Sequence, residues 1–558
     1  MITWERIPGT APRPIASCPS PTSGGLRCLW HGGFIANRRD LELETGFAGA
    51  SDADLLLEIY RREGLQTPRR IAGTFAWILW DGDAQRLLAA RDRLGTRGLF
   101  FRLFSRSICL AERVGALRRE PPSPDLNPVA VVCHIQGETP PPGETFLTGI
   151  HAVEPGTVLV VEPERLSSQF YWRPAPHPSL GFPSDEAYAD ACREILFRVT
   201  AEYAGPTAGI TLSGGLDSTA VAAALRAARP EDELRAVSWI SPELPEADES
   251  REIEAVVARL RLTLIPVAAD QHWPLSEGID AIPDTPHYNF YTTLWDATFR
   301  TAREHGVTTL FSGMSGDHLF GGGLPPYSDL LLRGRVGRMA AEIRAGLRQA
   351  PGLPRLLRSR VLGPIARSLT PWRDEYRPPP VSWLGEASQD LVRQTRPELP
   401  HLLMPGRRER LRILRDPLLP AVALLIEHQA SRHGIELRHP LLDHRLFDFA
   451  AALPTEQTWS GGLKKAILRR ALGDSLPREV TERPRKVYPV AIFHRGLRER
   501  EQSKAWALMT DMRAAEMGFV DEPKLRDEYR RYLSGETQRA LFWHTLTLEA
   551  WLRRYFPR

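Results

Sequence analysis

One segment constrains the fold of this chain more than any other: ITLSGGLDSTAVAAAL, residues 210–225. A short apolar run enters a turn of two glycines, and an alanine-rich stretch with helical character follows directly. Gly214 and Gly215 let the backbone turn tightly, so consecutive N–H groups can face an anion, and the start of the helix adds a partial positive charge. The segment therefore predicts a strand–turn–helix unit that binds a phosphate group.

The polar side chains of this turn indicate a nucleotide together with a metal ion. Ser213 and Ser218 can donate hydrogen bonds to phosphate oxygens. Asp217 would repel a phosphate, but it suits a Mg²⁺ ion that bridges its carboxylate and the phosphates. The loop motif GxxxxGK[ST] is absent, so the predicted loop is of a different kind.

The residues after this unit alternate between strand and helix patterns. Residues 234–240 are predicted to be a strand, 248–260 a helix and 263–267 a further strand. Two consecutive βα units that feed a third strand are typical of an open parallel sheet with helices on both faces. The rest of the C-terminal part is expected to be mostly helical.

The residues before 172 follow another pattern. Ser51–Gly64 is predicted to be a helix, and Ile71–Asp81 is the first of several consecutive strands. Such an order suggests a sandwich of sheets with helices packed on them. Trp172–Asp185 contains four prolines and is the predicted linker, so we expect domains at residues 1–172 and 185–558.

Composition excludes several classes of protein. Of the 558 residues, 42% are hydrophobic and 25% charged, which excludes a mainly disordered or a fibrous chain. The net charge of +4 gives no indication of a nucleic-acid partner. The five cysteines form no CxxC pair, which favours reduced thiols in a cytoplasmic protein. No run of about 18 apolar residues and no signal-peptide pattern occurs, so no membrane span is expected.

Five further motifs follow the glycine turn in a fixed order: Asp248–Ser250, Phe311–Asp317, Gly434–Asp443, Leu463–Arg469 and Arg483–Lys486. Together they resemble the synthetase domain of the asparagine synthetase family, over about residues 185–500. The resemblance implies an α/β ATP pyrophosphatase domain with a parallel sheet and a helical C-terminal region. Such domains cleave ATP between the α and β phosphates and adenylate a carboxylate, which an amine then converts to an amide with release of AMP.

The resemblance also implies the residues that act. Mg²⁺ is expected on Asp217 and Asp317, and Lys465 and Lys486 are expected to place positive charge on the phosphates. Glu427 lies on an apolar helix, where desolvation would raise its pKa, so it is either a general base or a structural ion-pair partner. The residues expected to contact ATP are Leu212, Ser213, Gly214, Gly215, Asp217, Ser218, Val237, Ser312 and Gly313.

Two details of the motifs concern other residues near this site. In β-lactam-forming relatives a tyrosine of the second glycine loop pairs with a glutamate, whereas Met314 takes that position here. His428, His433 and His439 are expected to pack or to face solvent rather than to bind metal, because Mg²⁺ prefers oxygen ligands.

The N-terminal part resembles the class II glutamine amidotransferase domain, an αββα sandwich, in Ser51–Gly64, Gly73–Trp77 and Ala90–Phe100. In that family the nucleophile is a cysteine directly after the initiator methionine, and its own α-amino group serves as the base. Position 2 is Ile2 here, and the first cysteine of the chain is Cys18. We therefore expect this domain not to hydrolyse glutamine.

Within the family the chain is most similar to lasso peptide cyclases. These macrolactam synthetases adenylate an Asp or Glu side chain of a precursor peptide and join it to the N-terminal amine of that peptide. The resemblance implies ATP and Mg²⁺ as cofactors, the precursor peptide as substrate, and a leader peptidase and a leader-binding protein as partners. An ammonia-using asparagine synthetase, a β-lactam synthetase and a nucleotide-binding scaffold without turnover remain the alternatives.

An arginine-rich stretch, residues 333–370, carries nine arginines and one acidic residue, Glu342. A run of like charges is usually a solvated helix face, and here it is equally a candidate surface for a peptide or a partner protein. The identity of the two substrates, the ring size and the oligomeric state do not follow from the sequence.

Overall fold

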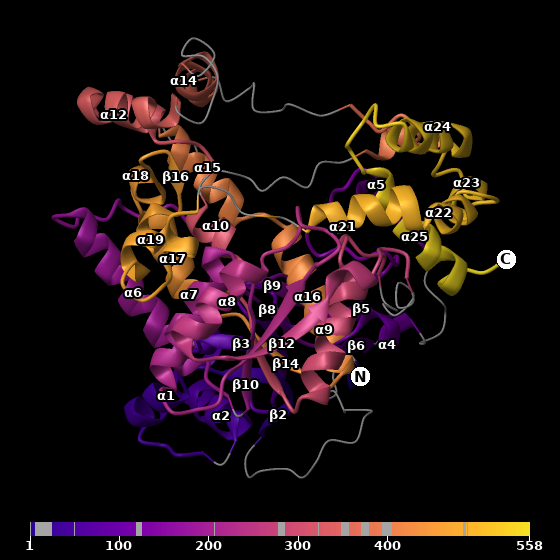
Figure 1. Ribbon diagram of the computed structural model, residues 1–558. Helices are drawn as coiled ribbons and strands as arrows, with labels where there is room; N and C mark the ends of the chain where they lie inside the picture. The colour runs from indigo at the N-terminus through magenta and orange to yellow at the C-terminus, as the bar shows by residue number, and fades with distance from the viewer. Residues whose placement is uncertain are drawn as a thin grey trace.

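The computed structural model describes residues 2–5, 25–49, 51–105, 107–118, 125–205, 207–276, 285–321, 323–347, 357–369, 379–392, 404–483, 487 and 489–558. The C-terminal part of the chain is built on a five-stranded sheet in which all neighbouring strands are parallel (Figure 1). The strand order is β12–β11–β10–β13–β14, so the connections run to one side of β10 first and then to the other. This order places a topological switch point at β10 and β13, the position where open α/β sheets bind ligands. The strands are β10 (Ala208–Thr211), β11 (Arg235–Ile240), β12 (Thr263–Ala268), β13 (Thr309–Phe311) and β14 (Glu436–Arg438).

Helices cover both faces of this sheet, as predicted from the βα pattern. On one face Ile210 and Ala236 belong to a hydrophobic cluster with α6 (Asp185–Glu202), α7 (Leu216–Ala228) and α8 (Ser250–Leu260). On the other face Val237 and Leu437 pack with the helices α9 (Thr292–Glu304) and α16 (Leu418–Arg432). Successive strand residues point to opposite faces, so Ala236 and Val237 serve the two clusters in turn.

The N-terminal part is a sandwich of two antiparallel sheets, with the orders β2–β3–β4–β8–β9 and β1–β6–β5–β7. One hydrophobic cluster fills the space between the sheets, and a second lies under α2 (Asp52–Glu63), whose N-cap Ser51 forms a capping box with Asp54. The helices α4 (Val114–Arg118) and α5 (Pro128–Ile135) pack on the other sheet. The αββα architecture expected from the sequence is thus present. Its strands are β1 (Ile2–Glu5), β2 (Leu26–Ile35), β3 (Gly73–Asp81), β4 (Arg86–Arg91), β5 (Phe100–Leu103), β6 (Ser107–Ala111), β7 (Ile150–Ala152), β8 (Thr157–Val161) and β9 (Leu166–Phe170).

Between β9 and α6 the chain contains neither helix nor strand, and the residues after β14 are mostly helical (Figure 1). The remaining α-helices are α1 (Arg38–Thr45), α3 (Thr67–Arg70), α10 (Gly316–Phe320), α11 (Tyr327–Leu332), α12 (Val336–Leu347), α14 (Gly363–Leu369), α15 (Pro405–Leu414), α17 (His444–Ala452), α18 (Thr455–Thr458), α19 (Ala466–Leu472), α20 (Arg478–Thr481), α21 (Val490–Arg495), α22 (Gln502–Leu508), α23 (Arg513–Glu516), α24 (Glu522–Leu533) and α25 (Phe542–Tyr555). No helix in the described part of the chain combines the length and apolar character needed to cross a membrane.

The arginine-rich stretch is partly tied to the body of the protein. Arg333 and Arg335 both form ion pairs with the buried Glu456, and Arg338 pairs with Asp185 at the start of α6. These three side chains therefore have structural partners, whereas Arg344, Arg358 and Arg360 are exposed. Arg348, Arg355 and the side chain of Arg367 lie outside the described part of the chain. A binding role for the stretch stays a prediction that applies to the exposed arginines.

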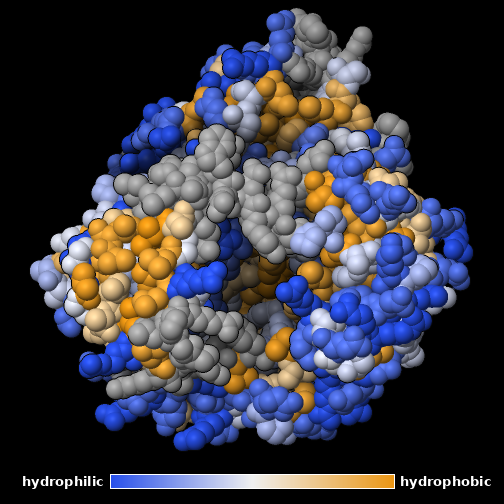
Figure 2. All heavy atoms as spheres, turned by 90° about the horizontal axis from the view of Figure 1, so that it is seen from above, coloured by the Kyte–Doolittle hydropathy of each residue, from blue (hydrophilic) through white to orange (hydrophobic). Residues whose placement is uncertain are grey.

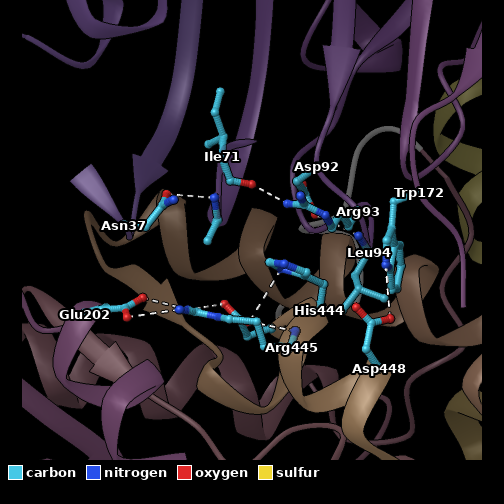
Figure 3. Close-up of polar contacts among 12 residues, drawn as sticks. Asn37, Ile71, Asp92, Arg93, Leu94, Trp172, Glu202, His444, Arg445 and Asp448 are labelled. Carbon is cyan, nitrogen blue, oxygen red and sulfur yellow. Dashed lines mark hydrogen bonds and ion pairs between the residues drawn. The ribbon is translucent and has the colours of Figure 1, made fainter. Parts of the chain in front are cut away.

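The two domains meet at the segment that follows β14 (Figure 3). Trp172 donates from Nε1 to Asp448 Oδ1 at 3.2 Å, and Leu94 packs in the same hydrophobic cluster as α17. Beside them Arg445 bridges two carboxylates: it lies 2.8 Å from Asp443 Oδ1 and 2.6 Å from Glu202 Oε2. Burial acts to raise the pKa of Asp443, but the hydrogen bonds from Arg445 outweigh it and hold that pKa below its ordinary value.

We predict that Arg445→Met lowers the free energy of unfolding at pH 7 by about 3–5 kcal/mol, because the buried Asp443 keeps its charge and loses its positively charged partner. A carboxyl whose pKa is lower in the folded than in the unfolded protein stabilises the fold at pH values above the unfolded pKa. This stabilisation is lost as the pH falls through the folded pKa. In the variant the carboxyl keeps the hydrogen bonds from the Tyr203 hydroxyl and from the backbone N–H of residue 445 but has lost the positive charge beside it. Its pKa should therefore rise, and the difference from wild type should shrink between pH 7 and pH 5. Urea unfolding followed by tryptophan fluorescence measures both effects. Arg229→Met, which removes an exposed ion pair with Asp232, is the control and should change the stability by less than about 1 kcal/mol. Equal urea midpoints for wild type and Arg445→Met at pH 7 would contradict the role of the bridge.

Candidate functional site

Four residues form a row across the carboxyl edge of the parallel sheet. Val237 of β11 pairs in register with Thr211 of β10. Ile210 pairs with Phe311, and Phe311 pairs with Arg438. The residues that directly follow these three, which are Thr211, Ser312 and His439, therefore lie level with one another and with Val237. All four residues of the row line one cavity of ≈ 330 Å³. The face toward the viewer in Figure 2 is hollowed near its centre, with hydrophobic side chains inside the hollow. The row is thus the floor of a site that spans four strands.

This cavity collects most of the residues predicted to contact ATP. Of the nine, only Gly214 does not line it; the others are Leu212, Ser213, Gly215, Asp217, Ser218, Val237, Ser312 and Gly313. They come from the ends of three strands and from the first turn of α7, although they are separated by up to a hundred residues in the sequence. Parallel pairing is the reason, because it brings the carboxyl ends of all strands to one edge.

The glycine turn is held in shape by its own hydroxyl groups. Ser218 Oγ lies 3.0 Å from Ser213 Oγ and accepts the backbone N–H of Ser213 at 3.1 Å, while Gly215 N–H donates to Ser213 Oγ. The loop after β13 packs tightly against this turn: a Cβ on Gly313 would lie 2.4 Å from the backbone nitrogen of Ser218. Only glycine allows the two loops to touch in this way.

Gly214 packs against the start of α8 and does not line the cavity. Its N–H donates to Glu249 Oε2 at 3.1 Å, and Glu249 also forms an ion pair with Arg483 at 2.9 Å. A Cβ on Gly214 would lie 2.8 Å from Cβ of Glu252 in α8. The glycine is needed for contact with α8, so the structure does not bring this predicted ATP contact to the site.

Lys465 joins the two aspartates predicted to bind Mg²⁺. Its Nζ lies 2.5 Å from Asp217 Oδ2 and 2.7 Å from Asp317 Oδ1. Burial lowers the pKa of Lys465, but the charges of Asp217 and Asp317 outweigh this effect, and the pKa is raised. Its backbone is left-handed, with φ 59°, so the residue turns sharply into α19 and aims its side chain at the loops after β10 and β13.

The same geometry fits a magnesium site. Two carboxylates that reach one ammonium lie close enough to share a cation, and carboxylate oxygens are the ligands that Mg²⁺ prefers. No cluster of three or more His, Cys, Asp or Glu side chains suited to a metal occurs in the described ranges. Mg²⁺ is commonly held by one or two carboxylates together with substrate phosphates and water, which is the donor set that Asp217 and Asp317 offer.

The other two predicted catalytic residues, Lys486 and Glu427, are not among the described residues that line the cavity. Lys486 lies outside the described residues, although its neighbour Val487 lines the cavity. Glu427 does not line it: its Oε1 accepts from Arg97 Nη1 at 2.6 Å, across the boundary between the domains. Burial raises the pKa of Glu427, and the charge of Arg97 opposes this rise. The geometry favours the ion-pair interpretation, and the general-base role stays a prediction.

Sequence reasoning missed two groups that line the cavity. Trp239, Tyr291 and Trp295 form an aromatic wall, with ring centroids 5.8 Å apart for Trp239 and Tyr291 and 5.0 Å apart for the two tryptophans. Trp239 lies in β11, Trp295 in α9 and Tyr291 directly before α9, which are positions typical of an ordinary core, and no motif marks them. His439 is buried beside Ser312 and lines the cavity, in agreement with packing rather than with exposure to solvent.

Comparison with known proteins identifies the family of the chain. The family model for asparagine synthase matches residues 203–553, and the model for the glutamine amidotransferase domain matches residues 31–172. The chain belongs to the asparagine synthetase family. It is accordingly an ATP-dependent ligase that forms a carbon–nitrogen bond, with a glutamine amidotransferase-like domain before the synthetase domain.

Relatives within the asparagine synthetase family cover the chain to different extents. A Mycobacterium tuberculosis protein described as a glutamine-hydrolysing asparagine synthetase is 26% identical and covers 92% of this chain and 83% of its own length. Asparagine synthetase 1 of Bacillus subtilis is 22% identical and covers 83% of this chain and 74% of its own. The carboxyethyl-arginine β-lactam synthase of Streptomyces clavuligerus is 30% identical over 41% of this chain and 42% of its own.

We predict that Asp217→Asn and Asp317→Asn each lower the rate of pyrophosphate release from ATP by at least about 100-fold, because each removes charge that holds Mg²⁺ against the phosphates. The release is measured with a coupled pyrophosphate assay, and circular dichroism checks that each variant is folded. Asp232→Asn, an exposed aspartate paired with Arg229, is the matched control and should leave the rate unchanged. A folded variant of either site residue with wild-type pyrophosphate release would exclude the two-aspartate site.

We also predict that the protein releases no glutamate from glutamine above background. The backbone of Ile2 belongs to β1 and pairs with Leu110 of β6, so the position of the amidotransferase nucleophile is filled by a strand residue without a thiol. A glutamate dehydrogenase-coupled assay measures the release. Glutamate formation at enzymatic rates would mean that another nucleophile serves this domain.

Proposed function

We propose that this member of the family is a macrolactam synthetase of the lasso peptide cyclase type, which adenylates an Asp or Glu side chain of a peptide and joins it to the N-terminal amine of that peptide. The observation that carries the proposal is the lining of the cavity. Its described charged residues are Asp217 and Glu249, and no lysine or arginine is among them.

Among the described residues of the lining, none offers a free cation to an α-carboxylate, because Lys465 already pairs with Asp217 and Asp317. This favours a carboxylate substrate that carries no second carboxylate into the cavity. Free aspartate brings its α-carboxylate into the site as well as the carboxylate that reacts. A buried carboxylate without a cationic partner costs several kcal/mol. In a peptide the corresponding group is a neutral amide, which needs only hydrogen bonds, so the cavity suits an internal Asp or Glu of a peptide better.

The aromatic wall supports the same class of substrate. Trp239 is fixed by a hydrogen bond from its Nε1 to Thr298 Oγ1 at 2.7 Å, and Trp295 stacks on Phe299 behind it. Rigid aromatic surfaces with few polar groups are typical of pockets that receive apolar side chains. A peptide presents such side chains next to its reacting carboxylate, whereas ammonia and aspartate do not.

The reaction has two balanced steps. A carboxylate oxygen attacks the α-phosphorus of ATP and displaces pyrophosphate, which gives an acyl-adenylate. The peptide amine then attacks the acyl carbon, loses a proton and displaces AMP, so the peptide becomes lighter by one water. Ser213, Gly215 and Ser218 bind phosphate oxygens, and Lys465 balances charge at the phosphates. Mg²⁺, when bound by Asp217 and Asp317, supplies further positive charge at the same place.

A single substrate that carries both reacting groups explains why no glutamine-derived ammonia is needed. Holding the amine next to the acyl carbon converts the second step into an intramolecular reaction of high effective concentration. The proposal includes the partners that the resemblance implies: a precursor peptide, a peptidase that frees its N-terminal amine, and a protein that binds its leader.

The test compares two reactions by mass spectrometry. With ATP, Mg²⁺ and the mature segment of a precursor peptide, we expect AMP and a product lighter than the peptide by one water, and no asparagine from aspartate and ammonium. Lys465→Met should lower the yield at least about 100-fold, whereas the matched change in the exposed neighbour, Lys464→Met, should not. Asparagine formed from ammonium at a competent rate, with no dehydration of any candidate peptide, would replace this proposal with the ammonia-using alternative.

A further inference from the structure

Arg469, the last residue of the motif Leu463–Arg469, donates three hydrogen bonds to backbone carbonyls. Its Nε lies 2.9 Å from the carbonyl oxygen of Lys464, and its Nη2 lies 2.8 Å from that of Arg483. Its Nη1 donates to the carbonyl oxygen of Thr481. The guanidinium of Arg469 thus joins the chain before α19 to the end of α20 and the residues that follow it.

Two contacts of Arg469 lie on either side of Lys465. The carbonyl of Lys464 accepts from the guanidinium, and the carbonyl of Lys465 accepts from the backbone N–H of Arg469 at 3.0 Å. The φ and ψ angles of a residue are set by the two peptide units that flank its Cα, so Arg469 fixes both angles of Lys465. These angles are 59° and 35°, a left-handed conformation that is unfavourable for residues other than glycine and persists only where neighbouring contacts hold it. Arg469 supplies such contacts.

The contact of Arg469 with Arg483 connects it to the glycine turn. Arg483 forms an ion pair with Glu249 at 2.9 Å, and Glu249 accepts the N–H of Gly214 at 3.1 Å. A Cβ on Gly214 would lie 3.1 Å from Nη1 of Arg483, so this guanidinium packs directly on the turn. A chain of contacts therefore runs from the turn through Glu249, Arg483 and Arg469 to the backbone of Lys465. The side chain of Lys465 then returns to the first turn of α7.

We propose that Arg469 is a positioning residue for the adenylation step, because it holds the backbone of Lys465 so that the Lys465 ammonium faces the phosphates at the glycine turn. Arg469 is not among the described residues that line the cavity, so it acts through Lys465. Its planar guanidinium supplies donors in three directions, whereas the ammonium of a lysine on a flexible stem cannot hold three carbonyls at once. This role rests on the adenylation chemistry of the family and holds for any carboxylate substrate.

The test compares Arg469→Met with the same change in the next residue of the helix, Arg470→Met. Arg470 is also anchored by its side chain, to Asp185 at 2.7 Å and to Gln457 Oε1 at 2.8 Å, but neither partner lines the cavity. Pyrophosphate release with Mg²⁺ over a range of ATP concentrations gives kcat and the KM for ATP, and circular dichroism checks that each variant is folded. We expect Arg469→Met to lower kcat about 30-fold and to leave the KM within threefold, because the ammonium acts mainly in the transition state. Arg469→Lys should lose nearly as much, and Arg470→Met should keep both constants within twofold.

A second background separates positioning from a general structural role. In Lys465→Met the positioned group is already absent, so adding Arg469→Met should lower kcat by less than twofold further. Equal fold losses in the two backgrounds would mean that Arg469 does not act through Lys465, and an unchanged kcat in folded Arg469→Met would exclude the role.

A crystal structure of Arg469→Met without nucleotide tests the geometry and needs no knowledge of the substrate. We expect Lys465 to leave the left-handed region and its Nζ to move away from Asp217 and Asp317. A Lys465 with unchanged backbone angles and unchanged contacts would overturn the proposal. Because neither measurement uses a peptide, failure of the macrolactam proposal would leave the expected results for Arg469 unchanged.

Discussion

The in-register pairing of parallel strands is the interaction on which the site depends. β10 pairs with β11 on one side and with β13 on the other, and β14 continues the same step. This register alone brings the ends of four strands, far apart in the sequence, to the floor of one cavity. A slip of one residue in any pair would turn the side chains of that strand to the opposite face. The aspartates and Lys465 then add charge beside a floor whose other residues are uncharged or neutral, which concentrates their electrostatic effect at the phosphate loop.

The N-terminal domain has a structural part in this arrangement. The guanidinium of Arg438 lies 3.8 Å from the ring centroid of Phe34 in the sandwich, and Arg438 directly precedes His439. Arg97 reaches across to Glu427 on α16, next to Ile426 of the cavity wall. Arg97 is itself presented by a turn whose backbone N–H groups donate to the buried Asp92. The sandwich, whose residue 2 is Ile2, thus contacts two walls of the synthetase site.

The sequence predicts those parts of the molecule that local chemistry determines. The glycine turn, the βα units and the sandwich follow from periodicity and motifs, and eight of the nine residues that the family resemblance implies as ATP contacts line one cavity. The remainder depends on partners distant in the chain. Glu427 contacts Arg97, 330 residues away in the sequence, and the N–H of Gly214 donates to Glu249, the residue directly before α8. The aromatic wall carries no local signal, because a core tryptophan has the same sequence pattern whether or not a cavity lies beside it. His439 lies in the motif Gly434–Asp443, but that motif does not indicate that its side chain lines the cavity.

The most direct test of the site is a crystal structure of the protein with Mg²⁺ and α,β-methylene-ATP, an analogue that cannot be cleaved at the reacting bond. We predict the base beside Val237, the phosphates against the turn at Ser213–Ser218, and a metal ion on Asp217 and Asp317 in place of the present contact with Lys465. The end of the cavity at His439 should stay open for the second substrate. A nucleotide bound outside this cavity, or bound with its phosphates away from the turn, would contradict the assignment of the adenylation site.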